Sequence, residues 1–214
     1  HYSATIIPAS IVAYTGTLAD IIMNLKNLNI AKKSREFAIS EIKKYGAPHL
    51  IHFEIAESKA VELAEELGVD KEIVLAGVYL MDVKLGEAFK KGKLSQHVDM
   101  SSVASREFLQ QFNLSAIQVN QIINCVEAHH GTIPFDSIEA EICANADCYR
   151  FIHPKGFFLF LTILGKRGSF PDALDMAEKK LDEKYNILSL DFCKNELEEV
   201  YRGLKSYISM ARQF

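Results

Sequence analysis

Histidine and aspartate side chains fall on the apolar faces of successive predicted helices in this sequence. Along 52–67, for example, His52 shares a stripe with Ala56 and Ala60 at helical spacing. The residues placed in this way are His52, Asp82, His97, His129, His130 and Asp147. Taken singly, each fits a hydrogen-bonded core residue, but burying several ionisable groups is costly unless they are paired or bind a cation. Because imidazole and carboxylate groups are ligands for divalent metals, the pattern predicts a buried metal site.

The elements that must position these residues are predicted to be helices almost throughout. Capping pairs open several of them, and glycine or proline ends them, as at Gly46 and Pro48. The expected helices are 18–45, 52–67, 71–83, 98–112, 115–130, 136–152, 157–164, 171–185 and 191–210. The expected capping pairs are Thr17 with Asp20, Ser115 with Gln118, and Asp136 with Glu139. The segment 86–95 is polar and predicts a loop. Without period-two alternation, hairpin signals, repeats or a linker, the sequence predicts an all-α protein.

Two C-terminal features bear on packing rather than on chemistry. The run 157–164 is apolar all round, which is typical of a buried helix. The last helix presents an apolar face made of Leu197, Val200, Tyr201, Leu204 and Ile208. This face suits packing on the bundle or on another subunit equally well, so a homodimer stays open.

Composition and charge exclude several classes of protein. The 214 residues are 49% hydrophobic and 24% charged, which excludes general disorder and suits one domain or two small ones. A net charge of −4 without a polybasic stripe predicts neither a nucleic-acid partner nor a membrane surface. We find no signal-peptide pattern and no apolar run long enough to span a bilayer. Cysteines without C-x-x-C spacing predict reduced, buried thiols in a cytoplasmic protein: Cys125, Cys143, Cys148 and Cys193.

The order of the histidines and aspartates resembles the HD superfamily of metal-dependent phosphohydrolases. The similar segments are His52-Phe-Glu-Ile-Ala, Leu80-Met81-Asp82-Val83, the stretch before His97, His129-His130-Gly131, and Ala146-Asp147 followed by Tyr149-Arg150-Phe151. They cover about 49–151. The resemblance implies an HD-like bundle of at least five helices around a central metal site. It is compatible with a single domain over 1–214 that carries additional C-terminal helices.

The resemblance also implies which residues bind metal. His52, Asp82 and Asp147 would hold a first divalent ion, and His97 with His129 or His130 would hold a second one. His49 is an alternative to His52. The identity of the ion, among Fe, Mn, Zn, Ni and Mg, is left open.

Met81 stands where the family has the histidine of its His-Asp motif. A thioether is a poor ligand for hard or borderline metals, so the first site loses an imidazole. Three interpretations follow from this change. Another histidine completes the site, the site binds metal weakly with water in the vacant position, or metal binding is lost.

The implied activity is hydrolysis of a phosphate ester, from a nucleotide or a small phosphorylated metabolite, by a metal-activated water. Asp82, His129 and His130 are the candidate catalytic residues. Lys84, Arg106 and Arg150 are the candidate phosphate-binding residues, with solvated surface charges as the alternative. The competing hypothesis is a degenerate HD domain that binds a nucleotide or a protein partner without catalysis. A di-iron oxygenase of the same fold and a structural domain are weaker alternatives.

Overall fold

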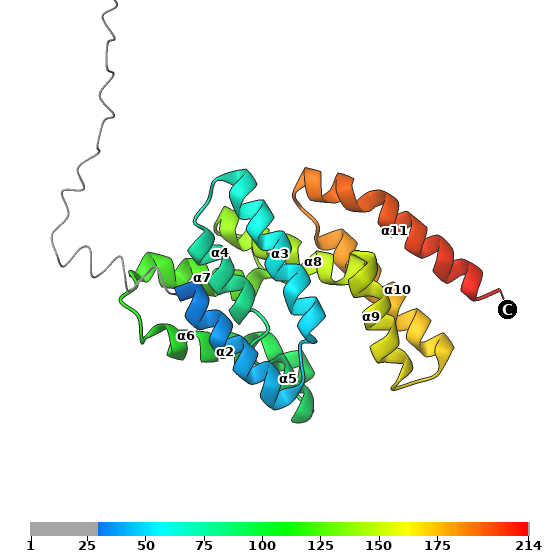
Figure 1. Cartoon of the computed structure of the whole chain (residues 1–214), viewed down its shortest axis with the longest axis horizontal. Coiled ribbons are helices and arrows are strands. Elements are labelled where there is room, and N and C mark those ends of the chain that lie inside the picture. The colour runs from blue at the N-terminus through cyan, green and yellow to red at the C-terminus, as the bar shows by residue number, and fades with distance from the viewer. Residues whose placement is uncertain (1–29, 214) are drawn as a thin grey trace, which may run out of the picture.

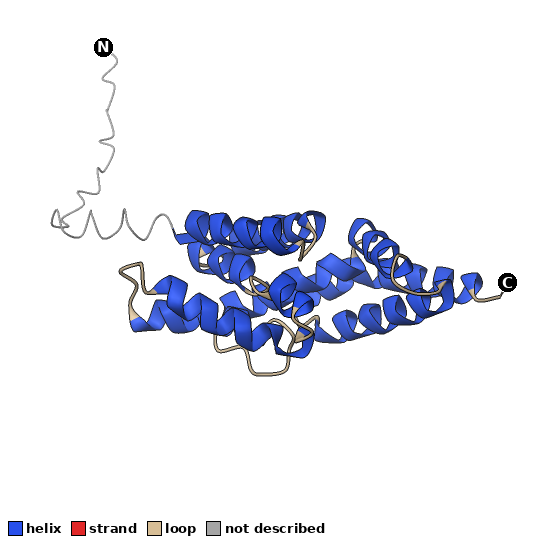
Figure 2. Ribbon diagram, turned by 90° about the horizontal axis from the view of Figure 1, so that it is seen from below, coloured by secondary structure: helices blue, strands red, loops and turns tan. Residues whose placement is uncertain are grey.

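The computed structural model describes residues 30–213, and within that range every regular element is a helix, as Figures 1 and 2 show. The prediction of an all-α fold is therefore confirmed. The helices are α2 (Ile30–Tyr45), α3 (Leu50–Leu67), α4 (Lys71–Leu80), α5 (Leu85–Lys90), α6 (His97–Leu109), α7 (Ala116–Ala128), α8 (Ile138–Ile152), α9 (Pro154–Gly165), α10 (Phe170–Ile187) and α11 (Asp191–Ala211). A short 3-10 turn, Leu94–Gln96, precedes α6.

Helix α8 forms the centre of the bundle, because α3, α4, α7, α9 and α10 all pack against it. Small side chains along α8, such as Ala140, Ala144 and Ala146, are fully buried and let the neighbouring helices approach closely. Helices α9, α10 and α11 extend from one end of the bundle (Figure 1). Any polar residue on α8 is therefore held in the interior of the protein.

A close contact at Gly77 brings α4 onto α7. A Cβ atom at this position would lie 2.4 Å from Cys125 Cβ and 3.0 Å from Cys143 Sγ, so only glycine fits. The chain leaves α4 just before Asp82 and leaves α7 just before His129. The contact therefore sets the positions of two candidate metal ligands.

Two local expectations are corrected by the structure. The predicted loop 86–95 contains α5 and the 3-10 turn, because Ala88 is fully buried and Gly86 packs against Tyr45 of α2. Tertiary packing thus overrides the polar composition of the segment. The N-cap of α8 is Ser137 rather than Asp136, since the Ser137 hydroxyl accepts from the backbone N–H of Ala140.

The other capping predictions have different outcomes. The capping box of Ser115 and Gln118 is confirmed, with both of its hydrogen bonds present. The expected pair Thr17 and Asp20, like the expected helix residues 18–29, lies outside the described residues.

The C-terminal helices pack by one face only. The expectation that 157–164 is buried all round is wrong, because Phe157 and Leu164 are buried in α9 whereas Phe158 is 52% exposed. Among the described residues, helix α9 is covered on one side by α8 and α10, with a smaller contact to α3, and is open on the other. The apolar face of α11, including Leu197 and Leu204, is buried in the protein's own core.

The predicted state of the cysteines is confirmed, since all four are unpaired and buried. No helix within 30–213 has the length and apolar character needed to cross a bilayer.

Candidate metal centre

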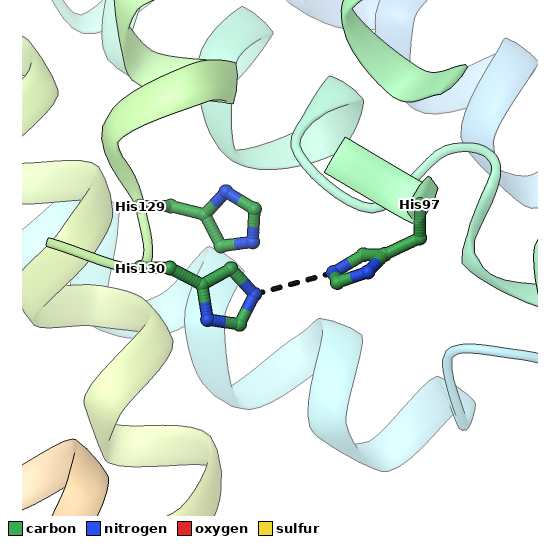
Figure 3. A group of neighbouring side chains, drawn as sticks. All are labelled: His97, His129 and His130. Carbon is green, nitrogen blue, oxygen red and sulfur yellow. Dashed lines mark hydrogen bonds between the residues drawn. The ribbon is translucent and has the colours of Figure 1, made fainter. Parts of the chain in front are cut away.

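Four polar side chains from three segments of the chain meet where α4 and α7 end and α6 begins. Asp82 lies on the turn after α4, and His97 is the first residue of α6. His129 and His130 directly follow α7 (Figure 3). Gly131, the next residue, has the left-handed conformation and turns the chain. Each residue thus sits at a helix end, where its position is fixed by the packing of that helix.

The three histidines form a cluster in which one ligand nitrogen from each lies within 4.8 Å of the others. The Nε2 atoms of His97 and His130 are 3.2 Å apart (Figure 3). The Nδ1 atom of His97 lies 2.7 Å from the Leu94 carbonyl, and that of His129 lies 2.7 Å from the Val126 carbonyl. Since a carbonyl only accepts, Nδ1 carries a proton in both rings, and the lone pair of a neutral ring is then on Nε2. Metal-binding histidines are commonly oriented by such a second hydrogen bond.

Asp82 faces this cluster with one carboxylate oxygen. Its Oδ1 atom lies 3.5 Å from His97 Nε2 and 3.7 Å from His129 Nε2. Both Asp82 Oδ1 and His129 Nε2 are buried without a hydrogen-bond partner among the described residues. Buried acceptors that face each other unpaired are costly, and a cation between them removes the cost. The donor set therefore fits a divalent metal.

The electrostatics keep these groups in the protonation states that bind metal. Burial lowers the pKa of His129 to about 3, so its ring is neutral at physiological pH. Burial also opposes ionisation of Asp82, but the charge of Arg150 outweighs it and holds the pKa of Asp82 well below its usual range. Asp82 is therefore an ionised carboxylate and His129 a neutral imidazole.

The other half of the predicted site is arranged differently. Arg150 Nη1 lies 2.6 Å from Asp82 Oδ2 and 2.8 Å from Asp147 Oδ1, so one guanidinium nitrogen bridges the two carboxylates. Lys184 Nζ lies 2.5 Å from Asp147 Oδ2. All of these side chains are buried. The space between Asp82 and Asp147 therefore does not fit a metal ion.

His52 is not brought to the histidine cluster. Its Nε2 atom lies 2.9 Å from the Gly156 carbonyl, to which it donates, and its ring lies against Phe151. Met81, the C-cap of α4, is buried and offers only a thioether. Of the ligands that the resemblance implied, Asp82, His97, His129 and His130 come together, whereas His52 and Asp147 are engaged elsewhere.

A pH-dependent contribution to stability follows from the burial of His52. Burial and the charge of Arg150 lower the pKa of His52 to about 4, below the unfolded value near 6.5. Its share of the stability is therefore fully present above about pH 6.5 and is lost as the pH falls towards 4, by roughly 2 kcal/mol at pH 5. His52→Gln keeps a donor for Gly156 and cannot titrate. Urea unfolding in EDTA should show a smaller stability loss between pH 7 and pH 5 in the variant, and equal losses would contradict the assignment.

The predicted phosphate-binding residues are dispersed. Lys84 Nζ pairs with Glu41 at 2.7 Å and Glu87 at 3.0 Å. Arg150 is buried between the two aspartates. Arg106, half-exposed and 3.3 Å from Glu127, is the one of the three that lines the cleft beside the histidines.

That cleft has a volume of about 790 Å³, and His97 and His130 form part of its wall. Its other charged and apolar lining residues are Asp99, Arg106, Glu127, Glu183, Val98, Val103 and Ile133. The carboxylates outnumber the single guanidinium. The cleft thus connects the rings of His97 and His130 to solvent through a surface that disfavours highly anionic molecules.

Sequence analysis missed Glu183 and Lys184, two residues from α10. Lys184 Nζ lies 3.3 Å from His130 Nδ1, and Glu183 Oε1 lies 3.7 Å from the same nitrogen. The signal in the sequence is weak, because Lys184 occupies a charged stretch of an amphipathic helix. Only the docking of α10 on α8 places it in the interior.

Comparisons with known proteins give a partial likeness. No protein-family model matches the chain. Over 110 residues, 51% of this chain, the sequence is 31% identical to "Ribonuclease Y" of Finegoldia magna. The chain spans about a fifth of the length of that curated relative. A solved structure, a predicted HD superfamily hydrolase from an uncultured Thermotogales bacterium, is 16% identical, with 86% of this chain and 99% of that chain covered and a TM-score of 0.49.

Proposed function

We propose that this protein is an HD-like, metal-dependent phosphohydrolase whose ion is held by Asp82, His97 and His129. One observation carries the proposal: Asp82 Oδ1 and His129 Nε2 face each other in the interior without a hydrogen-bond partner among residues 30–213. The Nε2 atom of His97 lies 3.5 Å from the same Asp82 oxygen, and it can act as a ligand because the proton is on Nδ1, which donates to Leu94. A divalent ion bound there would lower the pKa of a coordinated water and polarise a phosphoryl oxygen.

His130 has a different role in this proposal. The ammonium of Lys184 only donates, so His130 Nδ1 accepts from it and His130 Nε2 carries the ring proton. This N–H now donates towards His97 Nε2 at 3.2 Å. When the His97 nitrogen is engaged by an ion, the His130 proton is free to face the cleft. We propose that it is transferred to the leaving oxygen of the ester.

The lining of the cleft favours a substrate with little negative charge. Asp99, Glu127 and Glu183 would repel triphosphates and nucleic-acid backbones, whereas Arg106, although paired with Glu127, is half-exposed and would contact a single phosphate. Val103 and Ile133, both exposed, offer apolar contact to the organic part of the substrate. We therefore propose a phosphomonoester, such as a nucleoside monophosphate or a small phosphorylated metabolite.

The test combines metal analysis with a substrate panel. The purified chain, loaded separately with Mn, Fe, Co, Ni, Zn or Mg, is assayed with nucleoside monophosphates, sugar phosphates, a nucleoside triphosphate and a short RNA. We expect release of inorganic phosphate from monoesters with at least one of these metals. Cleavage of the RNA alone would overturn the substrate assignment in favour of a ribonuclease. Metal binding without any turnover would favour the degenerate domain that binds a ligand without catalysis.

Kinetics and metal analysis of one variant can show whether His130 acts as a general acid or as a metal ligand. His130→Gln should lower kcat for an alkyl phosphate about 100-fold, which is typical of the loss of a general acid. With p-nitrophenyl phosphate, whose leaving group needs no proton, the loss should be much smaller, and the metal content should not change. A matched His97→Gln variant should lose the metal and both activities. Loss of the metal from His130→Gln would instead identify His130 as a ligand.

A further inference from the structure

We infer that Arg150 and Lys184 take the place of a metal ion between Asp82 and Asp147, so that the centre can hold at most one ion, at the histidines. The inference deepens the proposed function at the same site. It concerns which cations the two buried aspartates hold, and it can be tested without turnover.

The contacts of the two aspartates carry the argument. Three of their four carboxylate oxygens are within 2.8 Å of a guanidinium or ammonium nitrogen, from Arg150 or Lys184. The fourth, Asp82 Oδ1, is the one aimed at the histidines. Together the two side chains carry the charge of one divalent ion. An additional ion between the aspartates would have to displace buried cations, at a large electrostatic cost.

The neighbouring side chains also favour Arg150 and Lys184 over a metal ion at this position. His52 donates to the Gly156 carbonyl, and Met81 offers only a thioether. The ring of Phe151 lies 5.4 Å from Arg150 Cζ and 5.8 Å from Lys184 Nζ, so its face further stabilises the two cations. The surroundings are therefore suited to organic cations and lack the imidazoles that a metal ion would need.

Lys184 also connects this cation pair to the histidine cluster. Its ammonium contacts both Asp147 and His130. Because Lys184 belongs to α10, the C-terminal helices contribute directly to the centre. Lys184 is thus a positioning residue, which fixes the tautomer of His130 and neutralises Asp147.

The experiment restores the missing ligand and removes the two cations. The variant Met81→His/Arg150→Leu/Lys184→Met is compared with the wild type by elemental analysis after loading with Mn or Co. We expect one equivalent of bound metal per chain in the wild type and one equivalent more in the variant. In EDTA the variant should melt at least about 10 °C lower, because its aspartates are uncompensated, and metal should restore its Tm. The Tm of the wild type should change less when metal is added.

Two outcomes would overturn the inference: a second equivalent in the wild type, or a folded triple variant that gains none. His52→Gln keeps the inference testable if the triple variant does not fold, since a loss of metal on this change would make His52 a ligand. The same experiment can also refute the proposed function without refuting this inference. A wild type without metal, beside a triple variant that gains one equivalent, would refute the hydrolase proposal and support the exchange of cations.

Discussion

His129→Asn is expected to abolish metal binding and to lower kcat/KM for phosphomonoesters by at least about 1,000-fold. The His129 ring is fully buried, and its Nε2 atom is one of the two unpartnered acceptors that define the centre. An ion that activates water and polarises the phosphoryl group contributes several kcal/mol to transition-state stabilisation, and about 4 kcal/mol corresponds to 1,000-fold in rate. Elemental analysis and steady-state kinetics on the metal-loaded proteins measure the two effects.

His49→Asn is the matched control for this prediction. His49 is exposed and caps α3 by accepting from the backbone N–H of Ile51, a role that asparagine also fills. The control should keep its metal and its activity. If His129→Asn kept stoichiometric metal while losing activity, His129 would not be a ligand, and the proposed centre would have to be rebuilt around the other histidines.

Much of the centre could be predicted because its residues lie at the ends of strongly patterned helices. Asp82 ends the apolar face of α4, and the box at Ser115 fixes where α7 begins. Once α4 and α7 pack through Gly77, the residues that follow them converge. Helical periodicity and capping are local properties, so the sequence alone carries them.

The parts that could not be predicted depend on tertiary packing. Arg150 follows Asp147 by one helical turn, which places it nearby but does not show that it also reaches Asp82. Lys184 enters the centre only through the docking of α10 on α8. His52 turns to Gly156 because α9 starts against α8: a Cβ at Gly156 would meet the Arg150 carbonyl. Side-chain orientation of this kind follows from the assembled bundle and not from spacing.

Arg150→Met is expected to lower the free energy of unfolding by about 3–5 kcal/mol, the usual cost of leaving buried charges uncompensated. Arg150 is the only described residue that pairs with both Asp82 and Asp147, and Lys184 reaches only the second of them. Arg150 holds the pKa of both carboxyls below the usual range against the opposing effect of burial, and Lys184 does the same for Asp147, so their pairing stabilises the fold above the unfolded pKa near 3.9. The difference between variant and wild type should therefore be full at pH 7 and shrink as the pH falls below about 4.

Arg106→Met is the matched control for the Arg150 variant, because Arg106 is half-exposed and pairs with a partly exposed Glu127. Exposed ion pairs contribute little, so we expect a change within about 0.5 kcal/mol. Urea unfolding in EDTA keeps metal binding out of the comparison. A loss below about 1 kcal/mol for Arg150→Met would mean that Asp82 and Asp147 are not held as a charged pair by the guanidinium.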